Sequence, residues 1–167
     1  MILTIKKALH KQKEDVCLSP IGNEFRIFVS SFRKGFYLYT EDGRQVGQVI
    51  FENGAATITA ADSSSMLVYA CGGGIAVKKK TYSEEEKRSV QAAETQRIKS
   101  TEYFTQGEVK NYNYRIFEQE GKKSMEVAAI IPDISDESNY RVRIAETGNI
   151  LKLLMVIISI DRLVEGG

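Results

Sequence analysis

Lysine and arginine residues have the clearest potential for chemistry in this sequence, because they gather in short clusters in its first half. Clustered cations attract anions, and near a membrane each contributes about 1 kcal/mol toward anionic lipid. On a strand, Lys78 and Lys80 point to the same face. The alternative is a solvated lysine surface that discourages pairing of sheet edges. The candidates for lipid or anion binding are Lys6, Lys7, Arg33, Lys34, Lys78, Lys79 and Lys80.

Residues for catalysis or metal binding are scarce. His10 is the only histidine, which argues against a Ser-His-Asp or Cys-His nucleophile. Cys17 and Cys71 lie far apart without CxxC spacing, so we expect buried free thiols rather than a zinc site. Glycines 72–74 lack the ending of a phosphate-binding P-loop and suit a bulge or tight bend between strands. The sequence therefore predicts a protein that is not an enzyme and holds no cofactor or metal.

Acidic residues follow Pro132, at Asp133, Asp136 and Glu137. Such a loop is either an ordinary solvated loop or a loose calcium site. The net charge of the whole chain is only +1, so we expect no nucleic acid partner. Basic residues prevail in the first 80 residues and acidic ones in the rest, which permits one basic face.

The length of 167 residues suits a single domain, and a hydrophobic fraction of 43% with 27% charged residues is typical of globular proteins. The first apolar residues are followed by two lysines, the reverse of a secretory signal. We expect a cytoplasmic protein, either free or peripheral at a membrane.

Residues 150–164 form an apolar stretch that predicts a helix. At about 1.5 Å per residue it would span roughly 22 Å, whereas a bilayer core needs roughly 30 Å. A helix that is apolar on every side must be surrounded on every side, so we expect a buried core helix rather than a tail anchor or interfacial helix. Thr147 and Asn149 are candidate N-caps. A carboxylate such as that of Asp161 is costly in an apolar helix unless it has a partner. We therefore expect that Asp161 either forms a hydrogen bond that fastens the helix end or reaches solvent. The alternative is a functional polar contact at the open end of the surrounding sheet.

The rest of the chain consists of alternating apolar and polar stretches separated by turn signals. Asp42-Gly43 and Asn53-Gly54 supply the positive φ that tight hairpins require. Residues 82–99 instead predict an exposed helix or mobile loop outside the sheet, with a capping box from Ser83 to Glu86. Since strands surround one apolar helix, the expected fold class is mainly β, a closed antiparallel barrel of about twelve strands wrapped around the C-terminal helix. The expected strands are residues 2–9, 16–18, 24–30, 36–40, 45–52, 55–60, 66–71, 75–79, 100–105, 111–118, 124–131 and 139–144.

Several stretches resemble one known family. Residues 36–49 read FYLYTEDGRQVGQV, a strand, an Asp-Gly turn and a strand. Residues 112–117 (YNYRIF) and 140–144 (YRVRI) then precede the apolar helix that ends Ile160-Asp161-Arg162. This pattern resembles the tubby C-terminal-like superfamily, in particular small bacterial LURP-one-related and phospholipid scramblase-like proteins. The resemblance covers nearly the whole chain except about residues 81–100, and implies a barrel closed around a helix. Its tubby relatives bind phosphoinositide headgroups through basic residues on the barrel.

Three functions remain open at this point. The first, which we favour, is a non-enzymatic module that binds an anionic phospholipid headgroup or a protein partner through its basic half. The second is a carrier or sensor whose barrel mouth holds a small apolar ligand beside the helix. The third is lipid scrambling, which is implied only by the resemblance. It is the weakest of the three, because the sequence shows no membrane-spanning segment, no cysteine-rich tract and no clear calcium loop.

Overall fold

The computed structural model describes residues 2–7, 16–18, 27–61, 64–71, 73–79, 101–145 and 149–164. The expected excursion at residues 82–99 lies outside these residues, as do His10 and Thr147. The side chains of residues 16–18, Lys79 and Thr101 are also outside the description.

The described residues form one antiparallel sheet of twelve strands and a C-terminal helix, so the mainly β class is confirmed. Each strand pairs with its neighbours along the chain, except that β1 pairs with β12. Where they fall on described residues, the strand predictions are confirmed to within three residues at either end, whereas the predicted strand residues 8–9, 24–26 and 100 lie outside the described residues. The elements are β1 (Ile2–Lys6), β2 (Val16–Leu18), β3 (Ile27–Phe32), β4 (Gly35–Thr40), β5 (Gln45–Glu52), β6 (Ala55–Ala60), β7 (Ser65–Cys71), β8 (Gly74–Lys79), β9 (Thr101–Glu108), η3 (Val109–Asn111), β10 (Asn113–Glu120), β11 (Lys123–Pro132), β12 (Asn139–Ile144) and α2 (Ile150–Val164).

The hairpin between β5 and β6 shows how local sequence sets the strand register. Asn53 and Gly54 both have positive φ, 54° and 74°, which matches the right-handed twist of the flanking strands. The pair Glu52 and Ala55 then starts a register in which Val49 faces Ile58. Both of these side chains are fully buried, so the turn places the apolar side of each strand toward the core.

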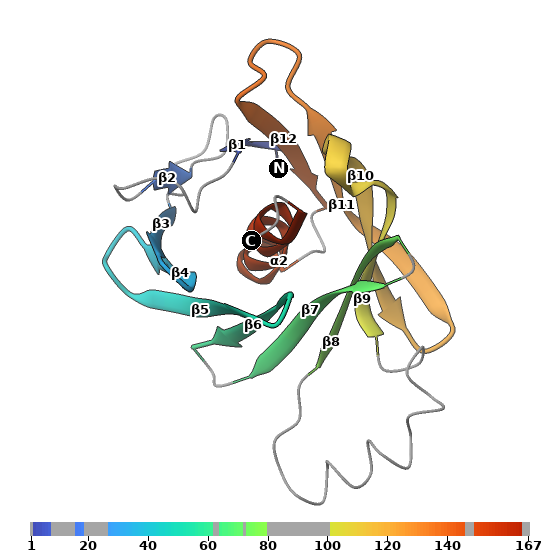
Figure 1. The fold of residues 1–167 in the computed structure, drawn as a ribbon, viewed down its shortest axis with the longest axis horizontal. Helices are drawn as coiled ribbons and strands as arrows, with labels where there is room; N and C mark the ends of the chain where they lie inside the picture. The colour runs from blue at the N-terminus through green and yellow to red at the C-terminus, as the bar shows by residue number, and fades with distance from the viewer. Residues whose placement is uncertain are drawn as a thin grey trace, which may run out of the picture.

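Helix α2 lies inside the curl of the sheet (Figure 1). Every residue from Leu153 to Asp161 is buried, as expected for a helix with no solvated face. Asn149 caps its start, since the Asn149 side-chain oxygen accepts a hydrogen bond from the Lys152 amide at 3.2 Å. Lys152 itself reaches the protein surface and forms an ion pair with Glu102 at 3.2 Å.

The sheet is not closed by hydrogen bonds between described residues. In the described part of the chain, β1 pairs only with β12 and β2 only with β3. These two edge strands nevertheless come close to each other on the same side of α2 (Figure 1). The prediction of a closed barrel is therefore confirmed only as far as a curled twelve-stranded sheet around a helix.

The position of Cys71 differs from the prediction. Cys71 is exposed, so the prediction of a buried thiol is wrong for this residue, because it ends β7 beyond the part of the strand that faces the core. Among the described helices, none has the length and apolar character needed to cross a bilayer.

Candidate anion-binding site at the end of the helix

The antiparallel sheet has two ends, and the basic candidates divide between them. The end where α2 finishes carries the turns at residues 33–34, 53–54, 109–112 and 133–138, and we call it the mouth. The opposite end, which we call the base, carries the turns at residues 41–44 and 121–122 and the start of α2. Lys6, Lys7, Arg33 and Lys34 are at the mouth, whereas Lys78 is near the base end of β8.

Lys78 therefore does not share a surface with the other described candidates. Its ammonium group lies 5.4 Å from the centre of the Tyr69 ring, a cation–π contact on the outside of the sheet. The side chain of Lys79 and the whole of Lys80 lie outside the described residues, so the predicted alignment of Lys78 with Lys80 stays a prediction.

Arg162, in the last turn of α2, brings a further cation to the mouth. Its Nη2 donates a hydrogen bond to the Arg33 carbonyl oxygen at 2.6 Å, and its guanidinium stacks 4.2 Å from the centre of the Phe51 ring. Its Nε and Nη1 are buried and have no hydrogen-bond acceptor among the described residues. Burial lowers the pKa of Arg162, because desolvation disfavours the charged form.

Arg33 and Lys34 form the turn beside this guanidinium, and both are exposed. The Lys34 carbonyl accepts a 2.7 Å hydrogen bond from the Phe51 amide, which fixes the turn against the ring that Arg162 covers. None of the ion pairs between described residues involves Arg33, Lys34 or Arg162. Three cationic residues therefore belong to this part of the mouth, and none of them forms an ion pair with a described carboxylate.

Asp161 ends the buried part of α2 and is only 5% exposed. The Tyr112 hydroxyl donates a 2.5 Å hydrogen bond to its Oδ1. This contact joins the helix to the turn between β9 and β10, which is the hydrogen-bonded arrangement that a carboxylate in an apolar helix needs. Burial and the nearby Asp161 raise the pKa values of Tyr114 and Tyr140, because a phenolate there would be desolvated and repelled.

Lys6 and Lys7 are less available for a ligand than Arg33 and Lys34. The Lys7 ammonium lies 4.5 Å from the centre of the Tyr112 ring and is half-buried. Lys6 is exposed, but its charge helps to lower the pKa of Asp136, after the larger effect of the Ser138 hydrogen bonds. Lys6 and Lys7 therefore interact with Asp136 and Tyr112, whereas Arg33 and Lys34 are exposed cations without an ion pair to any described residue.

The acidic loop between β11 and β12 is built from local turns. Asp133 accepts hydrogen bonds from the backbone and side chain of Ser135 and forms an ion pair with Arg141 at 3.6 Å. Asp136 accepts corresponding bonds from Ser138. No group of metal-ligating side chains occurs among the described residues, and the carboxylates already have partners, so the calcium alternative gains no support.

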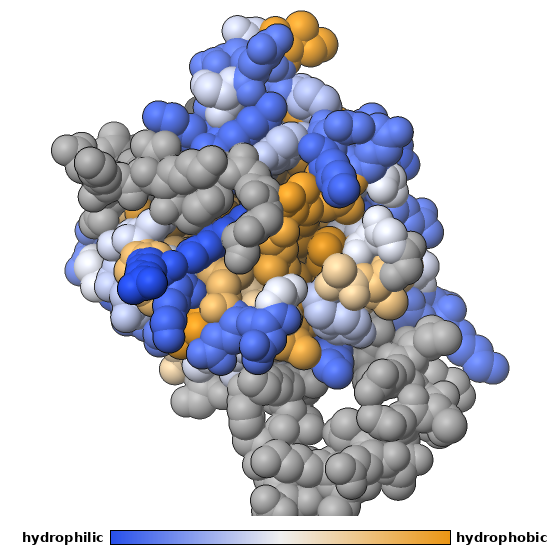
Figure 2. All heavy atoms as spheres, in the orientation of Figure 1, coloured by the Kyte–Doolittle hydropathy of each residue, from blue (hydrophilic) through white to orange (hydrophobic). Residues whose placement is uncertain are grey.

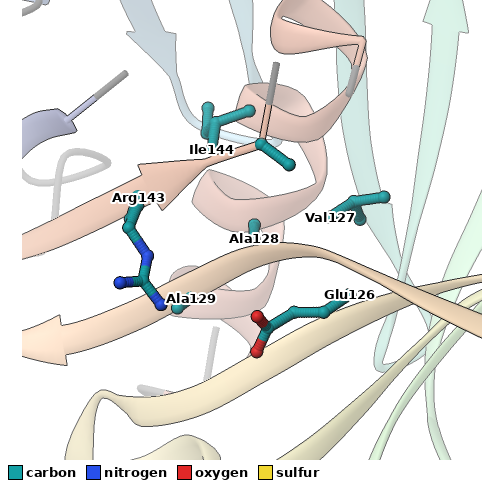
Figure 3. Close-up of a pocket in the computed structure, with 7 residues that line it drawn as sticks. Glu126, Val127, Ala128, Ala129, Arg143 and Ile144 are labelled. Carbon is teal, nitrogen blue, oxygen red and sulfur yellow. The ribbon is translucent and has the colours of Figure 1, made fainter. Parts of the chain in front are cut away.

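A pocket lies on β11 and β12, away from the basic residues of the mouth (Figure 3). The pairing of β10 and β11 shifts register beside it. It has a volume of about 220 Å³ and two charged lining residues, Glu126 and Arg143. Glu126 already forms an ion pair with Arg115 at 3.2 Å. Its described lining residues thus include one carboxylate, which is already paired, and neither a nucleophile nor a histidine, so they form no recognisable acid–base arrangement.

The middle of the face viewed in Figure 2, over the position of α2, carries hydrophobic residues framed by hydrophilic ones. Partly exposed apolar residues do occur at the end of the helix, namely Leu163 and Val164. The mouth thus combines cations with apolar surface.

The sequence pointed to Arg33 and Lys34 but missed Arg162 as a member of the same group. An arginine in the last turn of a helix is a recognised signal, because cations are favourable near helix C-termini. Its contact with residue 33 depends on how the sheet curls around the helix.

No family model matches the chain, and no curated protein or solved structure is significantly similar to it. The resemblance to the tubby-like family therefore stays a prediction.

Proposed function

We propose that this protein is a non-enzymatic, tubby-like binding module that attaches to membrane surfaces through anionic phospholipid headgroups. The headgroup would lie at the mouth, against Arg33 and Lys34 and near the buried charge of Arg162. In this proposal the edges of β1 and β2 complete a closed barrel, and the protein is peripheral at the membrane from the cytoplasmic side.

The observation that supports the proposal most is the unbalanced positive charge of these three residues. The Arg162 guanidinium pays a desolvation cost, and no described carboxylate offsets it. An anion near Arg33 and Lys34 would supply the missing opposite charge. Phosphate groups are favourable partners because charge-assisted hydrogen bonds to arginine are stronger than neutral ones.

Vesicle co-sedimentation tests the proposal. The full chain is mixed with phosphatidylcholine vesicles and with vesicles that contain added phosphatidylserine or phosphatidylinositol 4,5-bisphosphate, at low and high salt. We expect binding only to the anionic vesicles, with a loss at high salt because exposed charges are screened. Soluble glycerophosphate serves as a competitor and distinguishes a membrane ligand from a free phosphate compound.

Each of two matched variants removes two positive charges, one variant at the mouth and the other at the base. Arg33→Gln/Lys34→Gln should reduce vesicle binding by about tenfold or more, since each cation contributes about 1 kcal/mol. Lys122→Gln/Lys123→Gln removes two exposed lysines at the base and should leave binding unchanged. Equal losses in both variants would show unspecific charge attraction, and no binding to any vesicle would refute the proposal in favour of a protein partner.

A further inference from the structure

An apolar pocket opens at the mouth beside the end of α2, and Arg33 is not among its described lining residues. It has a volume of about 280 Å³ and lies between α2, the β5–β6 and β7–β8 turns and the start of η3. This volume is close to the lower limit of roughly 300 Å³ for small-molecule sites. Among its described lining residues, Leu163 and Val164 come from the last turn of α2.

The pocket exists because its walls lack side chains where the turns approach the helix. Gly54 and Gly73 both have positive φ, and a Cβ added at either would meet nothing within 4 Å. Ile75 and Val109 are buried and supply hydrocarbon below these turns. Leu163, in the last turn of α2, therefore lies next to open, mainly apolar space.

Lys110 is the one charged residue among the described residues that line this pocket. It is exposed, and no described carboxylate forms an ion pair with it. The nearby Glu108 carboxylate instead accepts a 2.9 Å hydrogen bond from the Asn111 side chain. The site consequently combines a hydrocarbon cavity with a single positive charge at its rim.

We infer that this pocket binds a single-chain amphiphile with an anionic headgroup, such as a fatty acid. The hydrocarbon chain occupies the space beside Leu163 and Val164, and the headgroup lies beside Lys110. This inference is independent of the proposed membrane attachment, because it uses a different part of the mouth and none of Arg33, Lys34 or Arg162.

A chain-length series of free carboxylates, below their micelle concentrations, tests the hydrocarbon part of the site by isothermal titration calorimetry. Hexanoate, octanoate and decanoate should bind with an affinity that rises about fourfold for each methylene that enters the pocket, which corresponds to about 0.8 kcal/mol. The gain should stop when the pocket is full. Affinity that does not change with chain length would overturn the inference.

Headgroup charge is tested with octanoate, 1-octanol and octylammonium. The order of affinity should be octanoate, then octanol, then octylammonium. Lys110→Gln should weaken octanoate binding by about two- to fivefold, the usual range for an exposed charge pair, without affecting octanol. Lys122→Gln, an exposed lysine at the base, is the matched control and should change neither.

Ala70→Phe tests the location of the site. Ala70 lines the pocket and is exposed, so the new ring fills the space without displacing a buried side chain. It should abolish octanoate binding, whereas Ala61→Phe, at an exposed alanine near the base, should not. Thermal unfolding checks that both variants fold. Undiminished binding in folded Ala70→Phe would refute this location.

The two proposals can fail separately. Arg33→Gln/Lys34→Gln should retain full octanoate affinity even if it loses vesicle binding. Loss of octanoate binding in this variant would place the ligand at the cationic turn instead and overturn the inference.

Discussion

Gly47 lies against Met155 of α2, and this tight contact gives a quantitative test of the core. Gly47 lies in β5 and is buried. A Cβ at this position would lie 2.4 Å from the Met155 sulfur, 3.1 Å from the Met155 methyl carbon and 3.1 Å from the Thr59 carbonyl oxygen. Real Cβ atoms essentially never come within 3.0 Å of another atom, so either the methionine or the strand must move.

Gly47→Ala should destabilise the protein by about 1–3 kcal/mol, the usual cost of overpacking a closed core. Met155 is flexible, but it is 2% exposed and has buried residues on both sides along α2, so its movement displaces other side chains. The φ of Gly47 lies outside the left-handed region, so the cost comes from packing rather than from the backbone. Urea unfolding measures the free energy, and an unchanged m-value shows that the unfolded state is comparable.

A double-mutant cycle with Met155→Ala identifies the contact. Met155→Ala alone should cost about 2–5 kcal/mol because it leaves a cavity. The alanine at position 47 then enters that cavity, so the double variant should be more stable than the sum of the single losses by about 1–3 kcal/mol.

Gly43→Ala is the control, because its φ of 85° predicts a cost from the backbone alone while its Cβ would meet nothing within 4 Å. This cost should add to that of Met155→Ala without any coupling. Strict additivity of Gly47→Ala and Met155→Ala would refute the packing that we describe.

Three further predictions concern the mouth and the sheet. Tyr112→Phe removes the hydrogen bond to Asp161 and should reduce the free energy of unfolding by about 1.5–3 kcal/mol, the range for hydrogen bonds to charged groups. Urea unfolding measures this loss, and a value below about 0.5 kcal/mol would contradict the role of the bond. Serine hydrogen bonds lower the pKa values of Asp133 and Asp136 below 3.8, so their stabilisation is complete above that pH and is lost as the pH falls through the lowered folded-state values. Thermal melts between pH 5 and pH 2 should show less acid destabilisation when both residues are changed to Asn, and identical profiles would contradict this. Gly107→Ala should cost more than about 1 kcal/mol, because φ is 117° and the new Cβ would lie 2.7 Å from a backbone oxygen across the β9–β10 pair; urea unfolding checks it, and a neutral effect would show that the pair can separate there.

The elements could be read from the sequence because their signals are local. The bounds of β5, β6, β12 and α2 are those predicted, since each begins or ends at a turn signal or a change of hydrophobic period. The sequence does not predict the short helix η3, because Val109 and Lys110 fall in the expected gap between strands and Asn111 is the first residue of an expected strand. Its C-cap, Tyr112, adopts a left-handed conformation with φ of 54°, which a tyrosine rarely takes without tertiary contacts.

The candidate site was only partly predictable. Clusters of neighbouring cations such as Arg33-Lys34 are visible in sequence, and both residues are at the mouth. The sequence presents Lys78 as a basic candidate like Arg33 and Lys34, but it lies toward the base. In a sheet of consecutive antiparallel strands, the number of chain reversals between two residues decides whether they lie at the same end. Arg162 lies at the end of α2 and Lys110 in the turn between β9 and β10. These two segments are far apart in the chain, and only the fold places both residues at the mouth.

The sequence by itself determined that a strand-rich chain must enclose an apolar helix, because residues 150–164 have no polar face to present to water. It also indicated that Asp161 needs either a hydrogen-bond partner or access to solvent. Only the tertiary structure decided that this partner is Tyr112, that Gly47 makes room for Met155, and which cations share the mouth. These depend on the curl and stagger of the sheet, which arise from the packing of all its strands around the helix rather than from any one segment.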